Sequence, residues 1–404
     1  MNQRTWMRGA AVTVVLLLPA NARAQHAHTP SADIGVDWGV HAIGLLTHAT
    51  PALAGRDLTE AYLTQPNIFL HLNALENRVS FTGTLNLEGL TLERGELNAG
   101  TWGEGYIDRR HPHTYLHEAV LSAGQNLAGT GLSVSAGRGF APFGTDDPMV
   151  RPFVKFPANH HLAQVLERLV LIGAVRRGPV LFEAGVFNGS EPLGPHDLGD
   201  LDRFADSWAA RLTATPVAGL ELQVSHARVR SPEVPTGGGL DQAKWSLSAR
   251  YEDEAVYALV EWARTGELRA SKELYALPSV LGEAAYRYGL WRLAVRAERT
   301  RRTEDERTHS NFRSPWPHTD GHVFGFTDWQ IYSASVGRTL PTGGLRTMPF
   351  IEVSHQRPEP HTRPTLFDPE ELYGSSRLWS LNLGIRIGAG LSHARMGRYG
   401  VAAH

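Results

Sequence analysis

The sequence predicts an all-β protein, a closed antiparallel transmembrane β-barrel of about sixteen strands. Three observations predict this fold. Apolar and polar side chains alternate with a two-residue period along the chain, short and long links alternate between the patterned segments, and the chain begins with an export signal. After that signal no apolar run is long enough for a membrane-spanning helix, so strands are the expected membrane-crossing elements.

The alternation is clearest in residues 377–388, where apolar residues occupy the odd positions from Trp379 to Ile387 and small polar residues or arginine occupy most of the even ones. A charged side chain at mid-bilayer costs about 2–4 kcal/mol on a lipid-facing surface, so we expect the charged faces to point into the barrel. An open sheet would leave unpaired edge groups in the bilayer, so we expect the sheet to close. Half-apolar strands also explain why only 42% of the residues are hydrophobic.

The expected strands share this alternation or are bounded by turn residues. They occupy residues 34–47, 66–75, 78–91, 116–124, 131–139, 167–176, 179–187, 207–216, 219–229, 244–253, 255–264, 279–288, 290–301, 330–339, 347–356 and 377–388. Tryptophans near strand ends are typical of the aromatic girdles at a membrane interface. The candidates are Trp208, Trp245, Trp262, Trp291, Trp329 and Trp379.

The links between these strands alternate in length. Short links are expected at 76–77, 125–130, 177–178, 217–218, 254, 289 and 341–346, and long polar links at 48–65, 92–115, 140–166, 188–206, 230–243, 265–278, 302–329 and 357–376. Short periplasmic turns and long extracellular loops are typical of outer-membrane barrels. The sequence therefore predicts location in the cell outer membrane of a Gram-negative bacterium, with outer-membrane lipid as a partner.

Residues 1–24 have the three parts of a cleaved signal peptide: a basic region with Arg4 and Arg8, an apolar run at 9–19, and the A-x-A site that ends at Ala24. Removing them takes away three arginines and no acidic residue, so the formal charge moves from −2 to −5. A mildly acidic chain gives no reason to expect nucleic acid as a partner. Because the chain has no cysteine, a disulfide scaffold, a thiol nucleophile and a cysteine lipid anchor are excluded.

The segment Ser135-Ala-Gly-Arg-Gly-Phe-Ala-Pro-Phe-Gly144 resembles the strand-to-loop junction of the phosphate-selective porin family and related general porins. The resemblance implies a sixteen-stranded outer-membrane channel that assembles as a homo-trimer. It also implies that the third extracellular loop, here residues 140–166, folds into the pore. The family's final aromatic residue is absent from this chain, which ends at His404.

The interior inferred from the alternation is nearly balanced in charge. The basic residues expected there are Arg78, Arg211, Lys244, Arg250, Arg292, Arg296 and Arg386, and the acidic ones are Glu88, Glu221, Glu252, Glu261, Glu298 and Glu352. Because a pore selects by the net field along its narrow part, this balance predicts weak charge selectivity unless the inserted loop breaks it. Seven pore-lining candidates follow: Arg211, Arg250, Arg292, Arg296, Glu298, Glu352 and Arg386.

The 140–166 loop is the expected pore constriction. It carries charges of both signs and two adjacent imidazoles, which are Asp146, Asp147, Arg151, Lys155, His160 and His161. Opposed charges across a constriction create a transverse field that favours polar solutes over apolar ones. The alternative is an external loop whose charges are simply solvated.

Residues 25–388 are expected to form the barrel, and residues 389–404 have two interpretations. The last strand continues to Tyr399, or these residues form a short periplasmic extension. The glycines between 388 and 390 interrupt the alternation and favour the extension.

We therefore expect a porin through which small hydrophilic solutes or ions diffuse passively, with no catalytic residue, metal site or cofactor. Three alternatives stay open: an outer-membrane barrel that handles metal, a barrel-borne hydrolase, and a soluble β-sandwich. The chain has 19 histidines, several of them grouped at 111–117, 160–161 and 309–322, but no spacing matches a defined metal site. No G-x-S-x-G, H-E-x-x-H or P-loop motif occurs.

Overall fold

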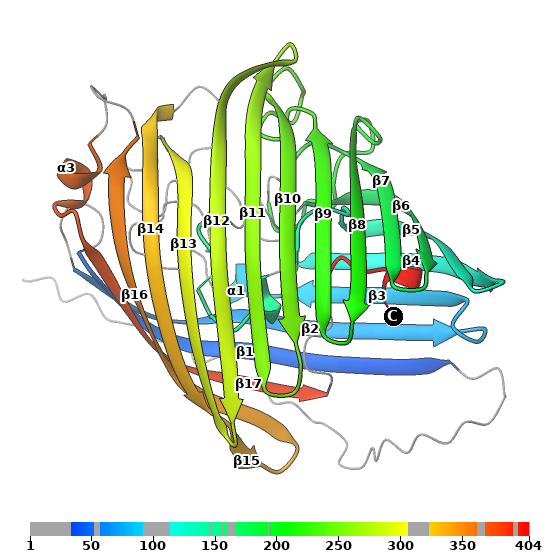
Figure 1. Ribbon diagram of the computed structural model, residues 1–404, viewed down its shortest axis with the longest axis horizontal. Helices are drawn as coiled ribbons and strands as arrows, with labels where there is room; N and C mark the ends of the chain where they lie inside the picture. Colours follow the sequence, from blue (N-terminus) through cyan, green and yellow to red (C-terminus); the bar gives the residue numbers. More distant parts are fainter. Residues whose placement is uncertain are drawn as a thin grey trace, which may run out of the picture.

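The computed structural model describes residues 34–51, 57–91, 114–145, 148–155, 157–159, 166–192, 194–305, 323–361, 368–390 and 395–403. Its strands form one antiparallel sheet in which neighbours along the chain pair with each other, and pairing of the first strand with the last closes the sheet into a barrel (Figure 1). The strands are β1 (Gly35–Thr50), β2 (Leu58–Ala74), β3 (Val79–Asn86), β4 (Leu116–Leu127), β5 (Thr130–Phe140), β6 (Glu167–Arg177), β7 (Val180–Phe187), β8 (Ser207–Val217), β9 (Leu220–Val229), β10 (Asp241–Glu252), β11 (Val256–Arg269), β12 (Lys272–Tyr288), β13 (Trp291–Asp305), β14 (Val323–Arg338), β15 (Leu340–Thr342), β16 (Leu345–Pro360) and β17 (Leu378–Gly390).

The wall has sixteen positions, as predicted. Strands β14 and β15 are separated only by Thr339 and both pair with β16, so together they fill one position. Each of the sixteen predicted segments overlaps one of these strands. The predicted all-β barrel is therefore confirmed, including residues 167–176, whose mostly apolar sequence is also compatible with a helix.

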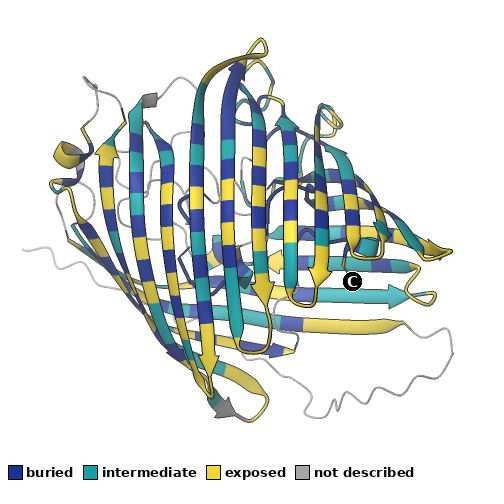
Figure 2. Cartoon of the chain, in the orientation of Figure 1, coloured by how far each residue is buried: buried dark blue, intermediate teal, exposed yellow. Residues whose placement is uncertain are grey.

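Burial follows the predicted alternation in the described strands (Figure 2). In β17 the five apolar residues from Trp379 to Ile387 are 37–48% exposed, whereas Ser380 and Asn382 between them are buried. Strand β13 behaves in the same way, with Leu293 and Val295 exposed and Arg296 buried. Apolar side chains thus cover the outside of the barrel, and polar side chains point inward.

One predicted girdle residue is placed differently. Five of the six tryptophans are exposed on the outer surface, but Trp329 is fully buried, with its ring edge-to-face against Tyr373 at a centroid distance of 5.5 Å. The parity of β14 explains the error, because Trp329 shares the inward face with Ile331 and Ser333, which are also buried, whereas Tyr332 is exposed.

The links alternate in length with one exception. Residues 265–278 were predicted to form a long polar link, and this is wrong: β11 runs to Arg269, β12 starts at Lys272, and only Ala270 and Ser271 connect them. Both linking residues have positive φ, at 49° and 68°. Two-residue hairpins of this kind favour Asn-Gly or Asp-Gly, so the Ala-Ser pair gives no sequence signal for the turn.

The helices in the described part of the chain are short. Helix α1 (Glu88–Thr91) follows β3, and α3 (Pro369–Tyr373) precedes β17. Within the described ranges no helix is long and apolar enough to cross a membrane. Residues 1–24, the predicted signal peptide, lie outside the described residues.

Candidate functional site: the inner face of the barrel

All seven predicted pore-lining residues lie on the polar, inward side of their strands. Arg211, Arg296, Glu298, Glu352 and Arg386 are buried, and Arg250 and Arg292 are partly buried. Most of them have identified partners. Arg211 makes a bidentate ion pair with Glu183 (2.7 and 2.8 Å), Arg296 pairs with Glu298 (2.8 Å), and Arg250 pairs with Glu252.

The segment between β5 and β6, residues 141–166, contacts the opposite wall of the barrel. The backbone N–H of Val154 donates to Glu352 on β16 (2.9 Å), and that of Ala158 donates to Glu298 on β13 (2.8 Å). In return, Arg386 on β17 donates to the carbonyl oxygen of Pro152 (3.1 Å). Charged side chains of the wall therefore satisfy the backbone groups of this segment, which would otherwise be costly to bury.

Side chains of the β5–β6 segment also pack against that wall. Phe153 lies beside Ala285 and Ala294, and the guanidinium of Arg296 lies 4.6 Å from the centre of its ring. Val154 belongs to a buried apolar cluster with Ile43 and Phe350. The segment is thus held by apolar contacts and by hydrogen bonds.

The predicted constriction residues are only partly described. Asp146, Asp147, His160 and His161 lie outside the described residues. Arg151 is buried and lies 3.6 Å from Glu261 and 3.7 Å from Glu283, while the Nζ of Lys155 donates to the Tyr62 hydroxyl (2.5 Å). Arg151 therefore lies beside two carboxylates that partly offset its charge, whereas the partner described for Lys155 is a neutral hydroxyl.

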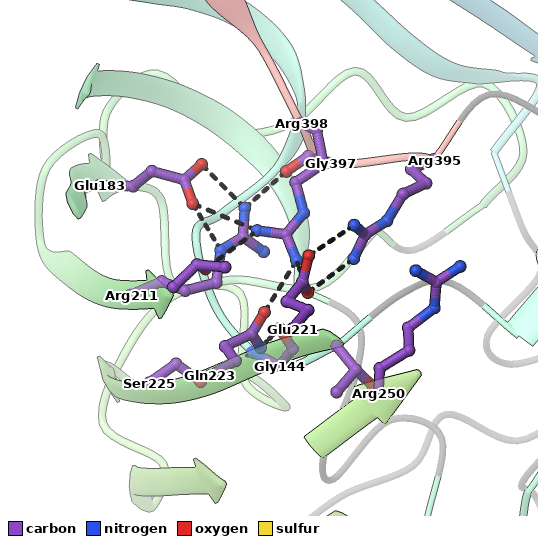
Figure 3. A network of polar contacts seen from close by, with 12 residues as sticks. Gly144, Glu183, Arg211, Glu221, Gln223, Ser225, Arg250, Arg395, Gly397 and Arg398 are labelled. Carbon is purple, nitrogen blue, oxygen red and sulfur yellow. Dashed lines mark hydrogen bonds and ion pairs between the residues drawn. The ribbon is translucent and has the colours of Figure 1, made fainter. Parts of the chain in front are cut away.

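The residues that follow β17 lie against the inner face of a different part of the wall. Strand β17 ends at Gly390, and residues 395–403 contact β4, β5, β8 and β9. Arg395 makes a bidentate pair with Glu221 (2.7 and 2.9 Å), and Arg398 donates to Gln223 (2.7 Å; Figure 3). Neither arrangement predicted for residues 389–404, a longer last strand or a periplasmic extension, places these residues in the lumen.

Tyr399 anchors the same segment. Its hydroxyl donates to Glu118 (2.8 Å) and accepts from the backbone N–H of Phe140 (2.9 Å), and the Gly397 N–H donates to the same Glu118 oxygen (3.0 Å). Burial and the nearby Glu118 carboxylate raise the pKa of Tyr399 well above its ordinary value. Burial lowers the pKa of Arg398 to about 10, so this guanidinium stays charged at neutral pH.

A cavity of about 400 Å³ lies beside residues 395–403. Its lining includes Arg176, Arg395 and Arg398, one carboxylate from Glu221, and apolar side chains such as Phe69 and Leu181. Cations therefore outnumber anions around this space.

A further buried polar cluster lies where β4, β5 and β6 meet. Glu167 accepts from Arg138 (2.6 Å) and lies 3.0 Å from Nδ1 of His117. His117 was one of the histidines behind the metal-handling alternative, and here it lies beside the Glu167 carboxylate and the Asn86 amide. Among the described residues no group of three or more histidine or acidic side chains could hold a metal ion. Most of the grouped histidines at 111–117, 160–161 and 309–322 lie outside those residues.

A closed sheet with an apolar exterior and a polar interior defines an outer-membrane β-barrel, because such a wall satisfies its backbone in lipid and encloses water. The protein accordingly resides in the outer membrane. No family model matches the sequence, and no curated protein matches it.

Comparison with solved structures finds porins and other outer-membrane proteins. The anion-selective porin from Comamonas acidovorans is 11% identical with a TM-score of 0.55, covering 88% of this chain and 100% of that chain. The trimer form of the outer-membrane protein OmpT from Vibrio cholerae is 9% identical, with 89% and 99% coverage and a TM-score of 0.52. OmpF of Salmonella typhi in complex with daunomycin is 10% identical, with 87% and 97% coverage and a TM-score of 0.51. At these identities the likeness establishes a porin-like fold, which confirms the resemblance drawn from the sequence.

Proposed function

We propose that this protein is a porin that lets small hydrophilic solutes and ions diffuse passively across the outer membrane. The observation that carries the proposal is the closed barrel with charged side chains on its inner face and apolar side chains on its outer face. A barrel of this width encloses an aqueous channel unless inserted segments narrow it. The mechanism is size exclusion with an electrostatic filter and involves no covalent chemistry, cofactor or metal.

The β5–β6 segment forms the constriction in this proposal, as an infolded loop. Its support is the set of hydrogen bonds from Val154 and Ala158 to wall glutamates on the far side of the barrel. The filter is weakly charge-selective, because the charges that face the passage come in both signs and many are paired. Asp146, Asp147, His160 and His161 belong to the same loop and complete the proposed constriction.

Two parts of the proposal concern assembly. Residues 1–24 are removed during export, in keeping with their three-part signal pattern. Three copies of the chain form a homo-trimer, which the trimer form of Vibrio cholerae OmpT supports by likeness. Light scattering of the detergent-extracted protein measures the number of chains, and a monomer would contradict this part alone.

Planar-bilayer recordings of the refolded protein test the channel. Discrete conductance steps are expected, and a salt gradient should give a small reversal potential. Arg151→Gln should shift that potential toward cations, because it leaves Glu261 and Glu283 without this cation. The matched control is Arg269→Gln, which removes the same charge from the exposed end of β11. A protein without channel steps would contradict the porin proposal.

A further inference from the structure

We propose that residues 395–403 form a resident plug inside the barrel, and that Arg395 and Arg398 on this plug set the ion preference of the passage beside it. The proposal rests on the channel function proposed above and adds to it. Neither the alternation nor the resemblance to porins assigns a role to these residues. Three features of the molecule support it: the shape of the wall, the charges that face the plug, and the cavity that the plug leaves open.

The wall and the plug fit each other closely at three glycines. A Cβ at Gly139 on β5 would lie 2.4 Å from the Tyr399 hydroxyl oxygen, and one at Gly131 would lie 3.2 Å from Cγ1 of Val401. On the plug itself, Gly400 has φ of 55°, and a Cβ there would lie 2.4 Å from Oγ of Ser133. Any side chain at Gly139 or Gly400 would displace the plug, so these glycines provide the close approach.

The charges of the wall also match the plug. Three glutamates, Glu118, Glu183 and Glu221, face it from β4, β7 and β9. Arg395 and Arg398 supply cations to this acidic wall, and Arg211 of the wall donates to the carbonyl oxygen of Gly397 (2.8 Å). Buried carboxylates need such partners, so the acidic wall provides a binding surface for the plug.

The plug leaves the cavity of about 400 Å³ described above, and this cavity gives the passage its preference. Arg176, Arg395 and Arg398 line it together with a single carboxylate, that of Glu221. A passage with this excess of positive charge favours anions. Without the plug, two of the three guanidinium groups disappear while the wall glutamates remain, so the preference shifts toward cations.

The first test removes the plug by ending the chain after Gly390. In planar bilayers the truncated barrel is expected to conduct at least about twofold more per open step, because the passage widens. Its reversal potential in a salt gradient should move toward cations. Arg269→Gln at the exposed end of β11 is the control and should change neither quantity. Equal conductance and equal reversal potential in the full and truncated proteins would overturn the proposal.

The second test does not depend on the truncated chain folding. The Cβ position of Gly131 lies 3.5 Å from Cβ of Val401, which is within the range for a disulfide, and the chain has no other cysteine. The double variant Gly131→Cys/Val401→Cys should therefore cross-link in nearly every folded molecule, as measured by thiol titration and mass spectrometry. Each single variant serves as a control.

The two tests separate this proposal from the channel proposal. Free thiols in the folded double variant would show that the plug does not lie against Gly131, and this would overturn the plug proposal. A cross-linked protein with full-length conductance, beside a truncated protein that conducts more, would support it. Cross-linking without channel steps in any variant would contradict the channel function and leave the position of the plug established.

Discussion

Two segments contact the inner face of this barrel, and they are held in opposite ways. The β5–β6 segment offers mainly its backbone: Glu352 and Glu298 accept from its N–H groups, and Arg386 donates to one of its carbonyl oxygens. The plug, residues 395–403, relies more on its own side chains, with Arg395 and Tyr399 donating to wall glutamates. Substitutions in the wall should therefore loosen the β5–β6 segment most. The plug should be loosened by substitutions in the wall and by substitutions in the plug itself.

The two segments also contact each other. Met396 of the plug belongs to a buried cluster with Met149 of the β5–β6 segment and with Phe140 at the end of β5. Gln223 on β9 bonds both segments, since its oxygen accepts from Arg398 and its amide nitrogen donates to the carbonyl oxygen of Gly144 (Figure 3). A change in the position of one segment should therefore alter the support of the other.

The largest loss of stability is expected from Arg211→Met, which removes a wall residue that donates to the plug. Arg211 and Glu183 form a buried bidentate pair, and Arg211 also donates to Gly397. Removing one partner of a buried pair costs about 3–5 kcal/mol when the other charge is left uncompensated. Arg398 stays 3.4 Å from Glu183 and offsets part of its charge, so we expect a loss near the lower end of this range. Unfolding in urea, followed by tryptophan fluorescence of the refolded barrel in vesicles, measures this loss. The double variant Arg211→Met/Glu183→Leu should recover most of it, and a loss below about 1 kcal/mol in the single variant would contradict the argument.

A smaller loss in the free energy of unfolding is expected from Glu352→Gln, which removes hydrogen bonds that hold the β5–β6 segment. Glu352 is fully buried and accepts from the N–H groups of Val154 (2.9 Å) and Lys155 (3.2 Å). Glutamine has one fewer acceptor oxygen and no charge, so we expect a loss of about 1.5–3 kcal/mol in the free energy of unfolding. Glu359→Gln, at an exposed position of the same strand, is the control. The Gly131–Val401 cross-link should still form in the Glu352→Gln background, because the plug keeps its own bonds to Glu118 and Glu221. Its loss would show that the plug depends on the β5–β6 segment for its position.

The wall was predictable because lipid and water impose a two-residue period on every strand, as the alternation from Trp379 to Ile387 shows. The same period placed charged residues such as Arg296 and Glu352 on the inner face. Prediction from the sequence was wrong at the β11–β12 hairpin, where the turn residues are unusual. Ala270 and Ser271 adopt positive φ without the residues that normally mark such a turn, so the β11–β12 hairpin looked like a loop.

The partners of the inserted segments were not predictable in this way. Tyr399 and Glu118 are far apart in the chain, and no periodic pattern connects an irregular segment to the residues it contacts. Likewise, the sequence marks Arg151 as charged but cannot show that Glu261 and Glu283 lie beside it. One signal was available: Gly131 and Gly139 within β5 are unfavourable in a strand unless another group approaches closely.

The smallest effect on stability, and the sharpest test of how the plug works, is expected from Arg395→Gln compared with Arg398→Gln. The Arg395 side chain is 30% exposed and that of Arg398 is 5% exposed. The Arg395–Glu221 pair is partly buried, and Arg398 stays 3.3 Å from Glu221 when Arg395 is replaced, so Arg395→Gln should lower the urea midpoint less than Arg398→Gln does. Both arginines line the same cavity, so each variant should shift the reversal potential toward cations by a similar amount, and less at high salt because salt screens the charge. A shift with Arg398→Gln alone would mean that loosening the plug, rather than the charge beside the passage, controls ion preference.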